Sequence, residues 1–332
     1  MTPTDYLPAA GRYDGAMPYR RSGQSGILLP ALALGLWKNF GHAAPYATSR
    51  ALVHYAFDHG VTHLDLANNY GPPPGSAEKT LGRILDDSLR PYRDELFIST
   101  KAGYEMWPGP YGNWGSRKSL MASLDQSLRR MRLDYVDLFY THRYDPATPL
   151  DETLQALVDI VRAGKALYVG ISRWPLEATR HALDYLRRHD TPCLIYQGRL
   201  NLLDRAPQRE GITQLLQTEG VGFISFSPLA QGLLTARYLD GIPADSRMRH
   251  EASLRPDALT PDLLSRLSRL QALAADSGRT VAQTALQWVL AQGATSVLVG
   301  ASRTEQLAED IATLQLPPLT PEELQAIEEI MG

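Results

Sequence analysis

The sequence predicts an α/β protein built as one closed barrel of eight parallel strands, a (β/α)8 or TIM barrel. Eight short apolar runs recur along the 332 residues, and stretches with apolar residues at helical spacing separate them. The starts of these runs lie about 30 residues apart, as repeated βα units require. A doubly wound sheet that binds a nucleotide would carry a G-x-G-x-x-G turn after an early strand, and the sequence has none.

The eight predicted strands are short runs rich in β-branched and other apolar side chains, the pattern of strands that are buried on both faces. They cover residues 31–36, 62–67, 96–100, 135–140, 166–172, 193–197, 221–227 and 295–300.

Helices are predicted between these strands wherever apolar residues follow a helical period. Gly60, Gly164 and Gly220 stand where a helix should stop before the next strand. The gap between the last two strands is longer and holds a loop at 228–260 followed by two helices. The predicted helices cover residues 48–59, 76–85, 118–131, 150–163, 176–188, 209–219 (a weaker pattern), 261–276, 280–291 and 304–314, with a tail helix from about Pro321.

The chain is expected to form a single domain over residues 1–332, with residues 1–18 as an extended N-terminal tail. Length alone suggests about two domains, but a barrel can use more than about 250 residues as one domain. The sequence contains no low-complexity linker that would separate two domains. One domain is therefore the better interpretation.

The composition argues against several classes of protein: nucleic-acid binders, disulfide-bonded proteins and membrane-spanning proteins. The 33 Lys and Arg against 36 Asp and Glu give a net charge of -3, which is unlike a nucleic-acid binder. Cys193 is the single cysteine, so no disulfide can form within the chain. The sequence shows neither a signal peptide nor an apolar stretch long enough to span a bilayer. A cytoplasmic protein without membrane insertion is expected.

Four polar residues lie at the ends of three consecutive predicted strands. Asp65 lies in the run 62–67, Tyr70 is in the loop after it, and Lys101 and His142 follow the third and fourth runs. The carboxyl ends of neighbouring strands meet at one face of a parallel barrel, so these side chains should converge there. Taken singly, a lysine or histidine at a strand end is more often structural, but four together favour catalysis.

This set of side chains suits the reduction of a carbonyl group. A tyrosine hydroxyl, whose ordinary pKa is about 10, can donate its proton to a developing alkoxide if a nearby cation assists. Lys101 is the candidate cation, and Asp65 is the counter-ion that keeps it charged. His142 should orient the carbonyl oxygen or stabilise its developing charge. A nicotinamide would supply the hydride, and no metal site is expected.

The sequence resembles the aldo-keto reductase family from about Tyr19 to Ile330. The most specific stretches are DLANNYGPPPGSAE, which contains Asp65 and Tyr70, and MWPGPYG, which follows the third strand. The family uses an Asp, Tyr, Lys and His tetrad on a (β/α)8 barrel, and the tetrad maps onto the four residues above. The resemblance implies reduction of small aldehydes such as L-glyceraldehyde 3-phosphate and methylglyoxal, and a homo-oligomer of four or more copies.

The resemblance also implies that NADPH lies across the strand ends. The sequence departs from the family pattern at two places: Asp310 replaces an Asn that many members carry, and Gly300-Ala301 replaces a Lys-Ser pair. The arginine that would bind the 2′-phosphate could be Arg237, Arg247 or Arg303. NADPH is still expected over NADH. The residues that match the family's cofactor contacts are Gly35, Leu36, Trp37, Asp65, Ser172, Arg173, Gln197, Phe226, Ser227, Pro228, Leu229, Ala230, Gln231, Gly232, Arg237, Tyr238, Arg247, Gly300, Ser302, Gln306, Glu309 and Asp310.

The substrate pocket is expected around the tetrad. Besides Tyr70 and His142, its predicted residues are Trp37 after the first strand and Tyr104 and Trp107 in the aromatic loop after the third. That loop could instead be a packed Ω-loop. Arg143, next to His142, is expected to receive an anionic group of the substrate.

Two other functions remain open at this point. The related potassium-channel β subunits share the barrel and the cofactor site, so the chain could be an NADPH-binding sensor of a membrane channel. His142 argues for an enzyme, because those subunits carry Asn at that place. A broad-specificity reductase that detoxifies aldehydes is the third interpretation, and variable pocket loops prevent a choice from sequence.

Overall fold

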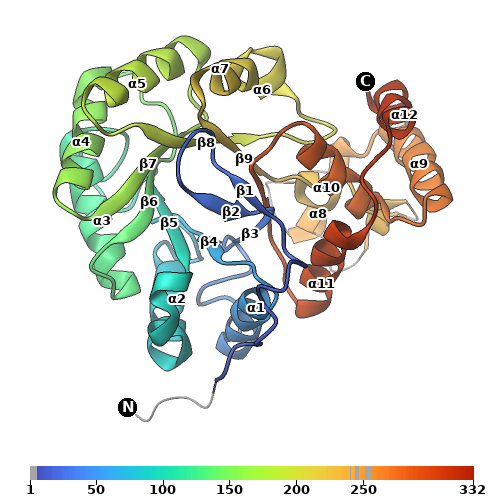
Figure 1. Ribbon diagram of the computed structural model, residues 1–332, viewed down its shortest axis with the longest axis horizontal. Helices are drawn as coiled ribbons and strands as arrows, with labels where there is room; N and C mark the ends of the chain where they lie inside the picture. The colour runs from blue at the N-terminus through green and yellow to red at the C-terminus, as the bar shows by residue number, and fades with distance from the viewer. Residues whose placement is uncertain (1–5, 240, 244–246, 251–253, 255) are drawn as a thin grey trace.

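A closed parallel barrel forms the centre of the molecule (Figure 1). The computed structural model describes residues 6–239, 241–243, 247–250, 254 and 256–332, without the side chains of Arg247 and His250. The strands pair in the order β10-β3-β4-β5-β6-β7-β8-β9. They are β3 (Leu32–Gly35), β4 (His63–Asp65), β5 (Phe97–Ala102), β6 (Val136–Thr141), β7 (Ala166–Ser172), β8 (Cys193–Arg199), β9 (Gly222–Phe226) and β10 (Ser296–Val299).

Helices surround the barrel and cover its outer face (Figure 1). The (β/α)8 prediction is confirmed, and each predicted strand lies within two residues of an observed one. The helices between and after the strands are α1 (Tyr46–Asp58), α2 (Ser76–Ile84), α3 (Arg117–Met131), α4 (Leu150–Arg162), α5 (Leu176–Arg188), α6 (Ala206–Arg209), α7 (Ile212–Glu219), α8 (Arg247–His250), α9 (Pro261–Asp276), α10 (Val281–Ala291), α11 (Thr304–Ala312) and α12 (Pro321–Met331).

Helix boundaries follow local chemistry. Ser116 caps α3, because its side chain accepts a hydrogen bond from the Ser119 amide. The helix expected at 209–219 begins later, as α7, and a separate short helix, α6, precedes it. Gly211 separates them at a φ of 79°, a left-handed conformation that favours glycine and interrupts the helix.

The end of the barrel at which the strands begin is covered by a hairpin that the sequence did not predict. It pairs β1 (Tyr19–Arg21) with β2 (Leu28–Pro30). Leu29 is fully buried in the cluster that fills this end, and the Ser22 hydroxyl donates to the Leu194 carbonyl over 3.0 Å. The hairpin closes one end, so the opposite, carboxyl end is where a ligand can approach.

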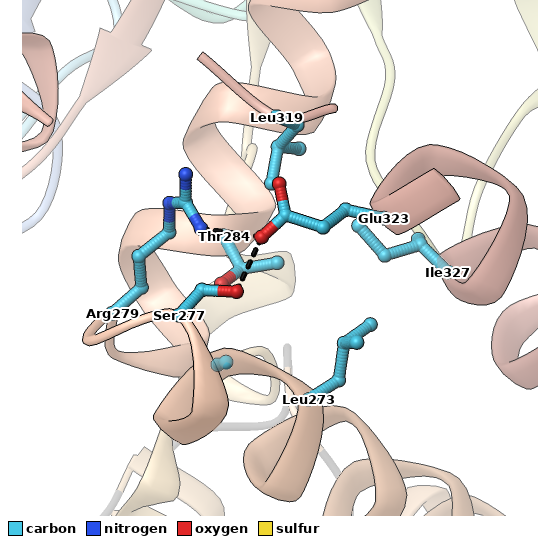
Figure 2. A pocket seen from close by; sticks show the side chains of 8 residues that line it. Leu273, Ser277, Arg279, Thr284, Leu319, Glu323 and Ile327 are labelled. Carbon is cyan, nitrogen blue, oxygen red and sulfur yellow. Dashed lines mark hydrogen bonds and ion pairs between the residues drawn. The ribbon is translucent and has the colours of Figure 1, made fainter. Parts of the chain in front are cut away.

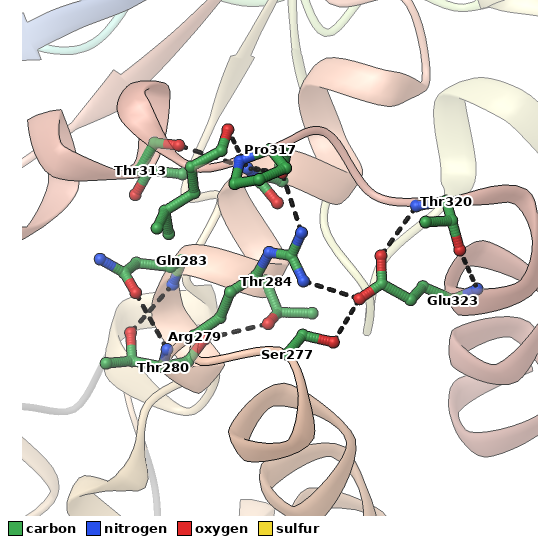
Figure 3. Close-up of polar contacts among 11 residues, drawn as sticks. Ser277, Arg279, Thr280, Gln283, Thr284, Thr313, Pro317, Thr320 and Glu323 are labelled. Atoms are coloured by element: carbon green, nitrogen blue, oxygen red, sulfur yellow. Dashed lines mark hydrogen bonds and ion pairs between the residues drawn. The ribbon is translucent and has the colours of Figure 1, made fainter.

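The C-terminal part adds α9, α10 and α12 beside the barrel. Arg279, 5% exposed at its side chain, donates to Glu323 of α12 over 2.6 Å and to the Pro317 carbonyl over 2.8 Å (Figure 3). Leu273, Ile327 and Thr284 line the small hollow beside this contact (Figure 2). These contacts attach the last helix and lie outside the strand-end site. Among the described residues, no helix combines the length and apolar character needed to cross a bilayer.

Candidate active site

Asp65 and Lys101 form a buried ion pair at the carboxyl end of the barrel. The Lys101 ammonium donates to Asp65 Oδ2 over 2.5 Å and to the Leu66 carbonyl over 2.6 Å. The two side chains are 0% and 2% exposed. Each charge therefore has a partner, as burial of a charge demands.

Strand register explains why these two residues meet. Asp65 of β4 lies directly opposite Ser99 of β5. Lys101 stands two residues after Ser99, so it projects from the same face of the sheet. A long side chain can reach such a diagonal position, and Lys101 does so.

Two neutral donors complete the surroundings of the Asp65 carboxylate. The Ser99 hydroxyl donates to Oδ1 over 2.7 Å, and the Gln197 amide of β8 donates to the same oxygen over 3.2 Å. The contact from β8 crosses the interior of the barrel. Asp65 thus connects strands that are distant in sequence.

Tyr70 lies beside this ion pair. The Lys101 nitrogen is 5.2 Å from the centre of the Tyr70 ring, and the His142 ring is 5.7 Å from it, edge to face. The Trp37 ring lies 6.2 Å away on the solvent side, where it is 41% exposed. The four predicted tetrad residues and Trp37 are therefore brought together.

Burial shapes the protonation of these groups. It raises the pKa of Tyr70 well above its ordinary value, and the Asp65 carboxylate adds to the effect. It lowers the pKa of Lys101, although the Asp65 carboxylate acts in the opposite direction. Burial, followed by Lys101, Arg173 and Arg143, lowers the pKa of His142 well below its ordinary range. His142 is therefore neutral near pH 7.

Arg143 is held in place next to His142. Its guanidinium donates to the Gly103 carbonyl and to the Asn113 side chain, each over 2.9 Å. It stacks on Trp114, 3.5 Å from the ring centre, and lies 4.3 Å from the centre of the Tyr104 ring. Two of its five N–H groups are thereby engaged, which leaves others available for an anion.

Tyr104 connects three strand ends. Its ring packs edge to face on His142 at 4.7 Å, and its hydroxyl accepts a hydrogen bond from Arg173 over 3.3 Å. Trp107 is half-buried further along the same loop, and its role as a substrate contact stays a prediction.

Several buried polar atoms near the tetrad have no hydrogen-bond partner among the described residues. They belong to Asn68, Asn69, Thr141 and His142, all at the carboxyl ends of β4 and β6. Buried polar atoms are normally paired. These unpaired atoms fit a site that forms hydrogen bonds with a polar ligand. A carbonyl substrate and a nicotinamide are both polar ligands of this kind.

Comparison with known proteins shows which family has this sequence and fold. The sequence pattern described as "Aldo/keto reductase family" matches residues 31–331. The chain belongs to the aldo/keto reductase family. It is accordingly an oxidoreductase of a family whose members generally use NAD(P)H.

Three aldo/keto reductase relatives illustrate the range of the similarity. The chain is 54% identical over 329 residues to L-glyceraldehyde 3-phosphate reductase of Escherichia coli O157:H7, which covers 98% of this chain and 95% of that one. It is 33% identical to a probable voltage-gated potassium channel subunit beta of Arabidopsis thaliana, over 95% and 97% of the two chains. The holo form of an aldo-keto reductase from Bacillus halodurans superposes with a TM-score of 0.77 at 26% identity, over 95% and 97%.

Several of the residues expected to contact the cofactor lie at the carboxyl ends of strands of this aldo/keto reductase barrel. Non-glycine residues with positive φ gather here: Arg173 at 59°, Ser227 at 53°, Ala230 at 47° and Gln231 at 59°. Such strained conformations are retained mainly at functional sites. They fit a loop that offers backbone N–H groups to phosphate.

The predicted adenosine end follows β10. The Ser302 amide and hydroxyl both donate to the Gln306 side chain, over 2.9 and 3.0 Å. Burial, with the Glu309 charge adding to it, raises the pKa of Asp310 to about 7. A carboxyl group that is partly protonated near pH 7 can donate as well as accept a hydrogen bond.

The structure describes the side chains of two of the three predicted phosphate-binding arginines. Arg237 and Arg303 are exposed near the strand ends, and each has interactions with neighbouring groups. Arg247 begins α8, and its side chain lies outside the described residues. The cofactor contacts as a set remain predictions.

Sequence reasoning missed three residues of the site. Ser99 binds Asp65, His63 binds Ser99, and Asn113 holds Arg143. The alternation of β5 was the signal for Ser99, because it places residues 99 and 101 on one face. His63 had the same signal, because it stands two residues before Asp65 on β4. Asn113 had no comparable signal, since it lies in the loop after β5.

Proposed function

We propose that the chain is an NADPH-dependent reductase of small aldehydes that takes L-glyceraldehyde 3-phosphate, and methylglyoxal as a further substrate. The observation that carries the proposal is the buried Lys101–Asp65 ion pair beside Tyr70 and His142. The 54% identity to L-glyceraldehyde 3-phosphate reductase supports the choice of substrate.

In the proposed reaction Tyr70 is the general acid. NADPH, when bound, would supply the hydride for the carbonyl carbon. The Tyr70 hydroxyl gives its proton to the carbonyl oxygen, so that the aldehyde becomes an alcohol. Tyr70 on its own is too weak an acid, because burial raises its pKa. The Lys101 cation offsets this by stabilising the tyrosinate that remains after transfer.

His142 is proposed to orient the substrate. Its imidazole is neutral near pH 7, since its pKa is lowered by burial and nearby cations. A neutral imidazole carries one N–H, which can donate to the carbonyl oxygen without repelling Lys101. The Tyr104 ring beside His142 and the Trp37 ring beside Tyr70 would exclude water from the reacting atoms.

NADPH is proposed over NADH because Arg237 and Arg303, which follow β9 and β10 in the chain, are exposed. Arg237, Arg247 and Arg303 are the candidates for the 2′-phosphate, which an arginine can bind through two oxygens. Equal kcat/KM values with NADPH and NADH would contradict this preference.

Turnover tests the proposed function directly. NADPH oxidation should be measured with L-glyceraldehyde 3-phosphate, glyceraldehyde, methylglyoxal and an aromatic aldehyde. The proposal expects the phosphorylated aldehyde to give the highest kcat/KM. Similar values for all four would favour the broad-specificity reductase instead.

A second candidate, a cofactor-binding subunit of a membrane channel, is favoured by the 33% identity to a probable channel β subunit over nearly its whole length. His142 argues against it, because the imidazole completes the proton-donating set around Tyr70. Tight NADPH binding without turnover of any aldehyde would favour this candidate.

Arg143 is proposed to bind the phosphate group of the substrate. Replacing it by glutamine should raise KM for L-glyceraldehyde 3-phosphate at least tenfold, since hydrogen bonds to charged groups contribute about 1.5–3 kcal/mol. Kinetics with unphosphorylated glyceraldehyde should change less than about threefold.

Arg129→Gln is the matched control for this measurement, because Arg129 is an exposed arginine on α3. It should leave both substrates unaffected. Equal losses for the phosphorylated and the neutral aldehyde in Arg143→Gln would show that Arg143 only supports the loop.

A further inference from the structure

A chain of three buried side chains leads away from the ion pair into the barrel. His63 Nε2 lies 2.9 Å from the Ser99 hydroxyl, and that hydroxyl lies 2.7 Å from Asp65 Oδ1. His63 and Ser99 are 0% exposed and Asp65 is 1% exposed. The proposed reaction assigns no role to His63 or Ser99.

The direction of these hydrogen bonds follows from the number of protons. The Asp65 carboxylate, paired with Lys101, can only accept, so the single hydrogen of the Ser99 hydroxyl points to it. The Ser99 oxygen must then accept from His63, which requires a proton on Nε2. Burial lowers the pKa of His63 to about 4, so the ring is neutral and Nδ1 carries no proton.

Nδ1 agrees with this assignment. It is buried and has no hydrogen-bond partner among the described residues. The chain therefore runs His63 Nε2–H to Ser99 O–H to Asp65. Hydrogen bonds arranged in series polarise one another, which strengthens the final bond to the carboxylate.

The strengthened bond bears on where the proton of the ion pair resides. A fully buried lysine and aspartate can exist as two ions, or as two neutral groups after the proton moves to the carboxylate. Burial favours the neutral form, whereas hydrogen bonds donated to the carboxylate favour the ions. Only the ionic form places a positive charge beside Tyr70, whose ring centre is 5.2 Å from the Lys101 nitrogen.

We propose that Ser99, oriented by His63, is a positioning residue that keeps Asp65 ionised and Lys101 charged beside Tyr70. This inference rests on the proposed function of Tyr70 as general acid. Gln197 also donates to Asp65, but over a longer distance of 3.2 Å. Ser99 is accordingly the stronger of the two neutral contacts.

A matched pair of variants tests the hydroxyl separately from packing. Ser99→Thr and Ser99→Val have nearly the same shape, and only threonine keeps the hydroxyl. Ser99→Val should lower kcat about 10- to 100-fold, while Ser99→Thr stays within about threefold of the parent protein. KM for the aldehyde and the dissociation constant of NADPH should hardly change, because Ser99 is 0% exposed.

Two kinetic results would overturn the inference: equal kcat values for the threonine and valine variants, or a loss confined to KM. Thermal unfolding of both variants checks that they fold. If Ser99→Val does not fold, His63→Gln and His63→Leu form a second pair, in which only glutamine keeps an N–H donor. Equal kcat values for that pair would overturn the inference in the same way.

A spectroscopic test needs neither cofactor nor turnover. The protein labelled with 15N-histidine contains eight histidines, and the signal absent from His63→Gln identifies His63. The inference expects a neutral ring with its proton on Nε2 near pH 7. A proton on Nδ1 would contradict the assigned hydrogen-bond direction.

The two tests keep this inference separate from the proposed function. If the parent protein reduces no aldehyde, the proposed function fails, and the histidine spectrum still decides the hydrogen-bond direction. If the parent protein is active and the threonine and valine variants are equal, only the role of Ser99 fails.

Discussion

Burial of charge is the property that the residues of the candidate site share. Lys101 and Asp65 remain paired at almost no exposure, and His142 becomes neutral in the same surroundings. The convergence of the four predicted tetrad residues was predictable from sequence, because polar residues at consecutive strand ends of a barrel meet at one face. Ser99 and His63 were missed because a small or aromatic residue in a buried strand is usually packing. Strand alternation places each on the face of a tetrad residue, but only the strand register shows that they contact each other.

Asp310 gives a test of burial at the residue scale. Its pKa is about 7 in the folded protein, against an ordinary value of 3.8. Between about pH 4 and pH 7, the folded protein therefore keeps a proton on Asp310 that the unfolded chain has already released. The stability that this proton contributes is fully present below about pH 4 and is lost as pH rises through about 7.

Asp310→Asn should remove the loss of folding stability that the parent protein shows as pH rises from about 4 to 7. Without cofactor, the variant should gain stability relative to the parent protein as pH rises from 4 to 8, by up to about 4 kcal/mol at about 1.4 kcal/mol per pKa unit. Thermal or urea unfolding of both proteins at several pH values measures the difference. A difference that is independent of pH would contradict the buried, protonated carboxyl group.

The strands and most helices were predictable because their patterns are local. The hairpin β1–β2 was not, since Tyr19–Arg21 has only three residues and two of them are charged. Its stability comes from contacts with residues far along the chain, such as Leu194. The loop at 228–260 likewise lacks a periodic pattern, and the structure places short helical turns and α8 within it.

The attachment of α12 can be tested through Arg279. The nearly buried guanidinium of Arg279 binds Glu323 and the Pro317 carbonyl, so Arg279→Gln removes the charged donor from both acceptors (Figure 3). We expect a loss of about 1–3 kcal/mol in the free energy of unfolding, measured by urea denaturation.

Arg188→Gln is the control, because Arg188 forms an exposed ion pair with Asp184 one helical turn away on α5. Its loss should be below about 0.5 kcal/mol. If both variants lose the same small amount, Arg279 does not attach α12.

At the scale of the whole molecule, the proposed reaction needs contributions from most of the barrel. Asp65, Lys101 and His142 come from β4, β5 and the end of β6, Gln197 comes from β8, and the proposed cofactor loop follows β9. A division of the chain would separate groups that must act together. This distribution supports the proposal that residues 1–332 form one domain.

Tyr70→Phe tests the central claim most directly. The variant keeps the ring that packs on His142 and Trp37 and loses only the proton that the proposed reaction transfers. With L-glyceraldehyde 3-phosphate and NADPH, kcat should fall at least about 100-fold, the usual scale for loss of a general acid, while NADPH binding measured by fluorescence stays unchanged. A variant that keeps the full kcat of the parent protein would contradict the assignment of Tyr70 as the proton donor.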